Sequence, residues 1–371
     1  MKRNLLAILL LFFLFAVAPW AKAQKYDKKQ GGGKPDPELS LKDNDYIDRQ
    51  DQVFLDTVQS ILAKYSPLVH DNFRRTTAKM LMDAVFHDHF TAYRKPVQQF
   101  FHARVDQVIQ ELEQTKVEKG VRIWKIYNMG FIARTKTVTL AFDLVSGSTS
   151  ESPDFSMNQD EMDRIVRQCD ALLISHRHED HADIQMAQKF VDLDLPVLTT
   201  EETWSNEPIH SKIIHPERSA EKLQHLKLKN YTLDLYVFPG HQLTSAINNV
   251  YLVKTPEGIT LAHDGDQINE GNFMMDWDWI DQVHKNQQVD VLMTNAWTTD
   301  IFRVVRGFNP ELVLPGHEIE LGHTVWDRLP YWGDDKYLGL NYAELKKSKY
   351  PVVAMIWGES YWFIPRLKNQ K

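Results

Sequence analysis

The stretch that most constrains this chain runs from residue 171 to residue 181, where a short apolar segment passes directly into histidines and acids. Ala171 to Ile174 predicts a buried strand, because a short apolar run with polar flanks is typical of a strand inside a sheet. Four polar side chains follow it within one turn-like segment: His176, His178, Asp180 and His181. Imidazoles and a carboxylate at this spacing can converge on one or two divalent ions, which predicts a metal site. The alternative is a polar loop whose histidines satisfy local hydrogen bonds.

Three later strand-like segments each deliver another group of this kind: Leu233 to Phe238 precedes His241, Ile259 to Ala262 precedes Asp264 and Asp266, and Leu312 to Leu314 precedes His317. Asp264 competes with Asp266 for the third position. His323 competes with His317, although His323 does not directly follow a strand. The segment Thr137 to Asp143 is also strand-like and ends on an acid.

The pattern His-x-His-x-Asp-His, followed in order by these residues, resembles the signature of the metallo-β-lactamase fold superfamily over roughly residues 121–364. The resemblance implies an α/β fold, a four-layer αββα sandwich with metals at one edge of two sheets. It also implies the ligand sets: His176, His178 and His241 for one ion, Asp180, His181 and His317 for the other, and Asp266 as the bridge. Asp143 resembles the Asp that orients the histidine loop in this family, with a plain strand-end turn as the alternative.

The cofactors implied by this resemblance are two divalent ions, zinc first, with manganese or iron as alternatives. Two such ions depress the pKa of a shared water and create a bridging hydroxide at neutral pH. Asp180 can orient this nucleophile and take its proton. We therefore expect a metal-dependent hydrolase acting on an ester-type bond: a phosphodiester, phosphoester or lactone.

Departures from relatives in the same superfamily refine this expectation. Redox members of this superfamily usually carry a Glu in place of His178, so the histidine here favours hydrolysis. Class B β-lactamases mostly place Cys or Ser near Asp266, so the Asp here favours ester-type bonds. The chain is similar to the branch of ascorbate-6-phosphate lactonase and N-acylphosphatidylethanolamine-hydrolysing phospholipase D, although Gln267 stands where family members often have Thr. β-Lactam hydrolysis and iron-dependent oxidoreductase chemistry remain the alternatives.

The expected substrate is a small molecule, or a lipid-like one if aromatic side chains line the cleft. Six tryptophans in segments after the strands are the candidates: Trp204, Trp277, Trp279, Trp297, Trp326 and Trp332. The net charge of −7 and the lack of a basic run argue against a nucleic-acid partner. The single cysteine, Cys169, excludes an internal disulfide, and we expect it to be buried. No sequence signal indicates a particular oligomeric state.

The N-terminal third has a different character from the rest. Residues 1–23 predict a signal peptide, with a basic start, an apolar run from Leu5 to Ala18 and the small residues Ala21 and Ala23, so we expect a periplasmic or secreted protein with no integral membrane segment after cleavage. A retained anchor is the alternative. Residues 24–38 predict a flexible linker, residues 39–117 an N-terminal helical region, and residues 118–371 the hydrolase domain.

Overall fold

The computed structural model describes residues 44–88, 90–148, 152–242, 246–269, 274–318, 321 and 349–366. The described residues from Asp45 onward belong to one compact unit. The predicted signal peptide and linker lie outside the described residues. Within the described part of the chain, no helix has both the length and the apolar character needed to cross a bilayer.

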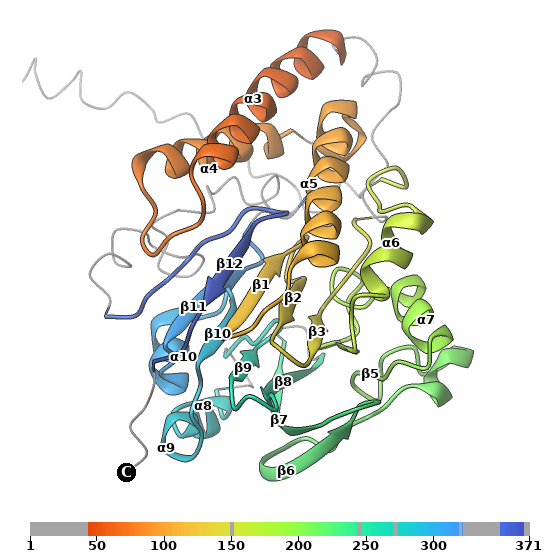
Figure 1. Ribbon diagram of the computed structural model, residues 1–371, viewed down its shortest axis with the longest axis vertical. Helices are drawn as coiled ribbons and strands as arrows, with labels where there is room; N and C mark the ends of the chain where they lie inside the picture. Colours follow the sequence, from red (N-terminus) through yellow and green to blue (C-terminus); the bar gives the residue numbers. More distant parts are fainter. Residues whose placement is uncertain are drawn as a thin grey trace, which may run out of the picture. The chain divides into compact units, whose positions relative to one another are not determined.

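The first sheet, among the described residues, consists of β1 (Val121–Lys125), β2 (Phe131–Arg134), β3 (Thr139–Phe142), β4 (Ala171–Leu173), β5 (Val197–Leu198) and β12 (Ser360–Phe363). The strand order is β12-β1-β2-β3-β4-β5. Figure 1 shows β12, β1, β2 and β3 side by side. From β12 to β3 the neighbours run antiparallel, whereas β3, β4 and β5 are parallel. The motif strand β4 therefore lies between two parallel neighbours.

The second sheet, in the described ranges, consists of β6 (Ser219–Lys227), β7 (Thr232–His241), β8 (Ile247–Lys254), β9 (Thr260–His263), β10 (Val291–Asn295) and β11 (Leu312–Gly316). The order is β11-β10-β9-β8-β7-β6. Here β9, β10 and β11 are the parallel set, and β6 to β9 pair antiparallel. Each sheet thus has one parallel trio, whose carboxyl ends are a common place for binding sites.

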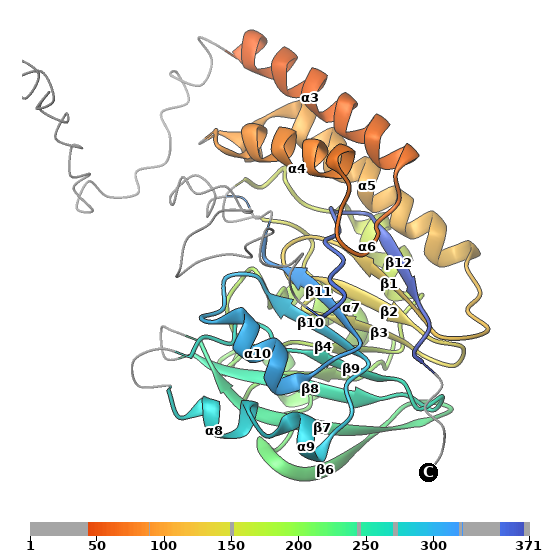
Figure 2. The ribbon, with the colours of Figure 1, turned by 90° about the vertical axis from the view of Figure 1, so that its left-hand side faces the viewer.

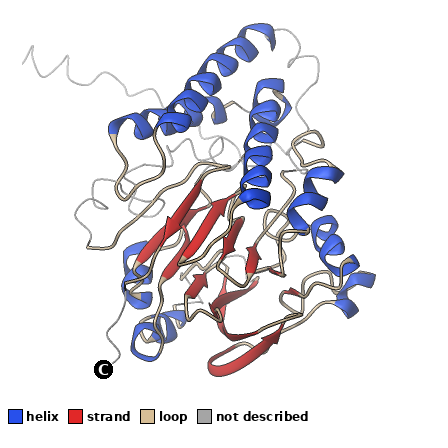
Figure 3. Ribbon diagram, in the orientation of Figure 1, coloured by secondary structure: helices blue, strands red, loops and turns tan. Residues whose placement is uncertain are grey.

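Helices cover the outer face of each sheet (Figures 2 and 3). On the first sheet these are α5 (Lys95–Gln114), α6 (Gln159–Val166) and α7 (Ile184–Asp192), and on the second α8 (Asp276–Ile280), α9 (Val283–Asn286) and α10 (Ile301–Phe308). A third apolar layer separates the two sheets. The expected four-layer α/β sandwich is therefore confirmed.

The motif strand shows why its sequence is apolar at every position. Ala171 and Leu173 pack into the layer between the sheets, whereas Leu172 and Ile174 pack under the helices. Successive side chains of a strand point to opposite faces, and both faces of this strand are covered. An uninterrupted apolar run is the pattern that such a strand requires.

The predicted helical region contains α3 (Asn44–Lys64), α4 (Phe73–Phe86), the short 3-10 helix η1 (Thr91–Tyr93) and α5. A second 3-10 helix, η2 (Pro208–Lys212), precedes β6. Apolar residues of α3, α4 and α5 share one core with the first sheet, as Val58, Met82 and Phe101 do with Trp124. The extra N-terminal helices are therefore confirmed as part of the fold, and they pack on the sheet domain.

Candidate metal centre

The histidine motif leaves β4 and turns before it enters α7. The N–H groups of His181 and Ala182 both donate to the carbonyl of His178, at 3.0 and 2.8 Å. Asp183 then caps α7, because its Oδ1 accepts from the N–H groups of Gln185 and Met186. A tight turn between a buried strand and a capped helix holds the motif side chains in place.

Six of the seven predicted ligands come together in the structure. One group contains Asp180, His181, Asp266 and His317, and the other contains His176, His178 and Asp266. The ligand atoms within each group all lie within 4.8 Å of one another. These residues come from the ends of β4, β9 and β11, so both parallel trios contribute to one site.

Asp266 belongs to both groups, and its two oxygens face different partners. Oδ1 lies 3.3 Å from Nε2 of His181 and 3.3 Å from Nε2 of His317. Oδ2 lies 3.6 Å from Nε2 of His176. This arrangement is the one that a carboxylate needs in order to bridge two ions.

Its competitor Asp264 points elsewhere. The hydroxyl of Thr294 and the N–H of Asn295 both donate to the Asp264 carboxyl group, which ties it to β10. Burial raises the pKa of Asp264 to about 8. The geometry therefore favours Asp266 over Asp264 as the bridging residue.

Asp143, at the end of β3, contacts the histidine loop that follows β4. Its Oδ2 lies 2.7 Å from Nδ1 of His181, and its two oxygens also accept from the N–H and the hydroxyl of Ser175, both at 2.6 Å. Donation from Nδ1 leaves the lone pair of Nε2 directed at the candidate site, as in many carboxylate–histidine–metal arrangements. Asp143 itself has a φ of +40°, a strained conformation at the end of β3.

His241 lies at the end of β7, and neither group of clustered ligand atoms includes it. Its Nδ1 lies 3.0 Å from Oδ2 of Asp276. Gln267 joins the two residues, because its Oε1 accepts from the His241 N–H at 3.2 Å and its Nε2 donates to Asp276 at 2.7 Å. The carboxylate sets the tautomer that a metal ligand needs, while the role of His241 as a ligand stays a prediction.

Asn128 is a site residue that the sequence reasoning missed. Its Nδ2 donates to Oδ2 of Asp180 at 2.9 Å and to the Asp180 carbonyl at 3.1 Å. It occupies a left-handed conformation, with a φ of +51°, in the turn between β1 and β2. Asn tolerates this conformation better than most residues, so an Asn followed two residues later by Gly130 was the only signal available.

His263 is fully buried behind the site. Its Nε2 lies 3.1 Å from the carbonyl of Met129, and its ring stacks on Phe142 with the centroids 5.4 Å apart. It is therefore a packed histidine with one hydrogen bond, and its Nδ1 makes none within the described residues.

Three carboxylates determine the electrostatic surroundings of His181. Burial would lower the pKa of His181, but Asp266, Asp180 and Asp143 outweigh it and hold the pKa well above its usual value. Burial would raise the pKa of Asp266, but the imidazoles of His181 and His317 hold it well below its usual value. Three carboxylates thus surround one imidazole, and this excess of negative charge favours a cation.

His176 and His178 differ from His181 in the direction of their pKa shifts. Burial and the nearby His181 lower the pKa of His176 to about 3. Burial also lowers the pKa of His178. Both imidazoles are therefore neutral at pH 7, which is the form that binds metals.

The donor set fits divalent metal ions. Nε2 of His181 is buried and makes no hydrogen bond within the described residues, although it lies 3.1 Å from Asp180 Oδ2. Mixed imidazole and carboxylate ligands suit zinc, manganese and iron. The residues present therefore match the expected metal-binding role, without distinguishing among these ions.

The tryptophans expected near the cleft are mostly packing residues. Trp277 and Trp279 belong to the apolar layer under α8 and α10, and Trp204 packs against the core of the first sheet. Trp297 does reach the site, because its indole N–H donates to the His317 carbonyl. Trp326 and Trp332 lie outside the described residues, as does His323.

Comparison with known proteins agrees with this arrangement. A family model described as "Beta-lactamase superfamily domain" matches residues 131–317, from β2 to the candidate ligand after β11. No curated protein matches the chain.

Several solved structures resemble this chain at low sequence identity. Igni18, a metallo hydrolase from the archaeon Ignicoccus hospitalis, is 15% identical over 66% of this chain and 99% of its own, with a TM-score of 0.45. An isothiocyanate hydrolase from Delia radicum gut bacteria is 14% identical over 66% of this chain and 100% of its own, with a TM-score of 0.45. CmlA, a diiron β-hydroxylase from Streptomyces venezuelae, is 13% identical over 67% of this chain and 55% of its own, with a TM-score of 0.42.

Proposed function

This chain belongs to the metallo-β-lactamase superfamily, and from that premise we propose that it is a binuclear metal-dependent hydrolase of ester-type bonds. The observation that carries the proposal is the Asp266 carboxylate, which presents one oxygen to each group of candidate ligands. A single-ion site would need only one of these groups. Zinc is our first choice of metal, because imidazole and carboxylate ligands suit it.

The candidate ligands would bind the two ions in two sets that share Asp266. Asp180, His181 and His317 would hold one ion, and His176 and His178, joined by His241, would hold the other, with Asp266 shared. Bound there, the ions would supply an activated water at neutral pH and stabilise the negative charge that develops during hydrolysis.

Asp180 is our candidate for the catalytic base. Its side chain is 27% exposed, in contrast to the fully buried His181. Burial would raise its pKa, but His181 and His317 hold the pKa well below its usual value. It is therefore ionised at neutral pH and can orient a nucleophilic water and receive its proton.

Elemental analysis of the purified protein beside two matched variants tests this proposal. Asp266→Asn removes the shared carboxylate, so we expect it to lose bound metal. Asp264→Asn makes the same change at a carboxyl group that bonds to β10 and belongs to neither ligand group, so we expect it to retain the metal of the parent.

Each result has a clear reading. About two zinc ions in the parent and in Asp264→Asn, with a loss in Asp266→Asn, would support the binuclear site. One iron per chain would overturn it in favour of the redox alternative, and a folded protein that binds no metal would favour a binding role. Turnover of a chromogenic phosphodiester, a lactone and nitrocefin would then separate ester hydrolysis from β-lactam hydrolysis.

We also propose that the chain is exported and acts on a small-molecule substrate outside the cytoplasm. The support is the order of a basic start, an apolar run and the small residues Ala21 and Ala23 before Gln24. N-terminal sequencing of the protein made in a secreting bacterial host should begin near Gln24. Recovery of the full-length chain from the membrane fraction would contradict cleavage.

A further inference from the structure

The turn between β1 and β2, residues 126–130, touches segments that carry the candidate ligands. Nδ2 of Asn128 donates to Oδ2 of Asp180 at 2.9 Å, and the carbonyl of Asn128 accepts from the N–H of His317 at 3.3 Å. Asn128 thus contacts two members of the ligand group that contains Asp180 and His317. One of them lies in the motif loop and the other follows β11. Neither contact is visible in the sequence, since Asn128 precedes Asp180 by 52 positions.

This turn is itself held firmly. The buried ammonium group of Lys125 donates to the carbonyls of Asn128 and Pro315, both at 3.1 Å, so it joins the turn to the strand that delivers His317. A Cβ on Gly316 would collide with the sulfur of Met129, which shows how closely the turn packs against this strand. The position of Asn128 is therefore set by the surrounding structure.

The oxygen that Asn128 contacts is the one that faces the imidazoles. Oδ2 of Asp180 lies 3.1 Å from Nε2 of His181 and 3.3 Å from Nε2 of His317. Asp180 is also the most exposed member of its group. An exposed carboxylate needs a fixed donor if its oxygen is to stay on one position, because otherwise the side chain can rotate towards water.

We propose that Asn128 is a positioning residue that holds Asp180 on the ion bound by Asp180, His181 and His317. It would thereby set the affinity of that ion alone. The inference rests on the proposed binuclear function. The other ligand group, with His176 and His178, has no contact with Asn128 among the interactions of the described residues. Loss of the Asn128 amide should therefore weaken one ion and leave the other unchanged.

The variant Asn128→Gly isolates the amide. Glycine adopts positive φ without strain, and it retains the carbonyl that Lys125 and His317 contact. The substitution removes the buried side chain of Asn128 and with it both hydrogen bonds from Nδ2, to the carboxylate and to the carbonyl of Asp180. Removing an outer-shell partner of this kind typically costs about 10–100-fold in metal affinity.

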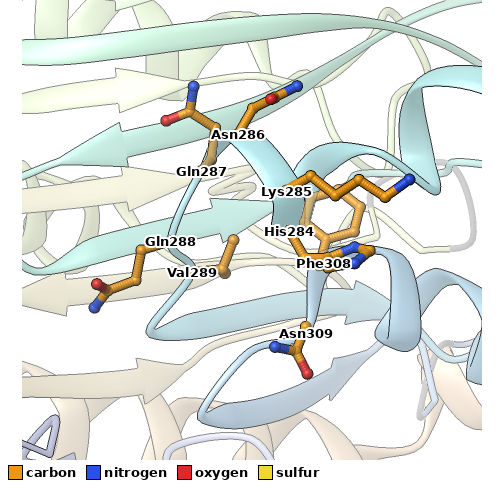
Figure 4. Close-up of a pocket in the computed structure, with 8 residues that line it drawn as sticks. All are labelled: His284, Lys285, Asn286, Gln287, Gln288, Val289, Phe308 and Asn309. Atoms are coloured by element: carbon orange, nitrogen blue, oxygen red, sulfur yellow. The ribbon is translucent and has the colours of Figure 1, made fainter. Parts of the chain in front are cut away.

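Asn309 offers a control for an asparagine-to-glycine change at a left-handed backbone position. It is also left-handed, with a φ of +48°, and it ends α10 at the opposite end of β11 from His317. It lines the pocket shown in Figure 4, beside Phe308 and Val289, where no candidate ligand lies. Asn309→Gly should therefore keep the metal affinities of the parent.

The experiment is a zinc titration of the three proteins against a chromogenic chelator, with thermal unfolding recorded in parallel. We expect two affinities in the parent and in Asn309→Gly, and a loss of about 10–100-fold in only one of them in Asn128→Gly. Unchanged affinities in Asn128→Gly, or an equal loss for both ions together with a lower Tm, would overturn the inference and leave the proposed function standing. A parent that binds fewer than two ions would overturn both.

Discussion

The carboxylate of Asp143 and the imidazole of His181 lie 2.7 Å apart with both side chains fully buried. They come from the ends of neighbouring parallel strands, and the contact sets which nitrogen of His181 faces the candidate ions. The orientation of the ligand thus depends on a residue that touches no ion itself.

The substitution Asp143→Asn should therefore reduce metal affinity and activity by about 10–100-fold, because an amide at this position disturbs the acceptor for Nδ1 of His181. Chelator competition and steady-state kinetics measure the two effects. Asp170→Asn is the control, since Asp170 lies just before β4 and accepts from the N–H of Thr139 far from the motif. Equal losses in both variants would show a general effect on the sheet.

A second prediction concerns His241. If His241 binds the ion held by His176 and His178, then Asp276→Asn should lower the affinity for that ion by about 10–100-fold. The reason is that Asp276 contacts Nδ1 of His241. Asp278→Asn, on the exposed side of the same short helix, serves as the control and should have no effect. Unchanged zinc affinity in Asp276→Asn would argue for removing His241 from the ligand set.

The third prediction tests how the N-terminal helices are joined to the sheets. Arg75 on α4 is fully buried and forms two hydrogen bonds of 2.6 Å with Glu359, just before β12. Arg75→Met leaves that carboxylate buried without its partner, so it should lower the free energy of unfolding by about 3–5 kcal/mol. Urea denaturation measures the loss.

The exposed pair of Arg49 and Asp45 provides the control for this measurement, because solvent-exposed ion pairs contribute little to stability. Arg49→Met should leave the urea midpoint unchanged. A similar small effect in Arg75→Met would mean that the helices are only loosely joined to the domain.

A fourth prediction is a pH dependence from Lys125. Burial lowers its pKa from 10.5 to about 8, so between these values the unfolded chain binds more protons than the folded one. The contribution of Lys125 to stability should therefore rise with pH in this window, by at most about 1.4 kcal/mol per pH unit, and it is measured as the difference between the parent and Lys125→Met. Lys125→Met should lack this rise, as urea denaturation from pH 7.5 to 10.5 would show, and parallel curves for both proteins would contradict the prediction.

The fifth prediction concerns Cys169, which is buried as expected. Burial raises the pKa of its thiol to about 12, so almost no thiolate is present at pH 8. Iodoacetamide should leave the native protein unmodified and should label the chain in guanidinium chloride. Rapid labelling of the native protein would show that the strand before the motif opens readily.

Local pattern was sufficient for the parts of the fold where chemistry and periodicity coincide. The apolar run before His176, and the segments before Asp266 and His317, are strands that end where metal-binding groups begin. Strands such as β6 and β12 were missed, because β6 is rich in charged residues and β12 pairs with β1 from the far end of the chain. Their stability comes from partners that a local reading does not contain.

The sequence by itself determined the family resemblance, the four-layer architecture and most of the residues that come together at the candidate site. Only the tertiary structure distinguished the surroundings of Asp264 and Asp266, since one carboxyl group is bonded to β10 and the other faces the imidazoles. It also brought Asn128 to Asp180 and Asp276 to His241. The physical reason is that the direction of a side chain depends on donors and acceptors supplied by distant segments, and residue spacing carries no record of them.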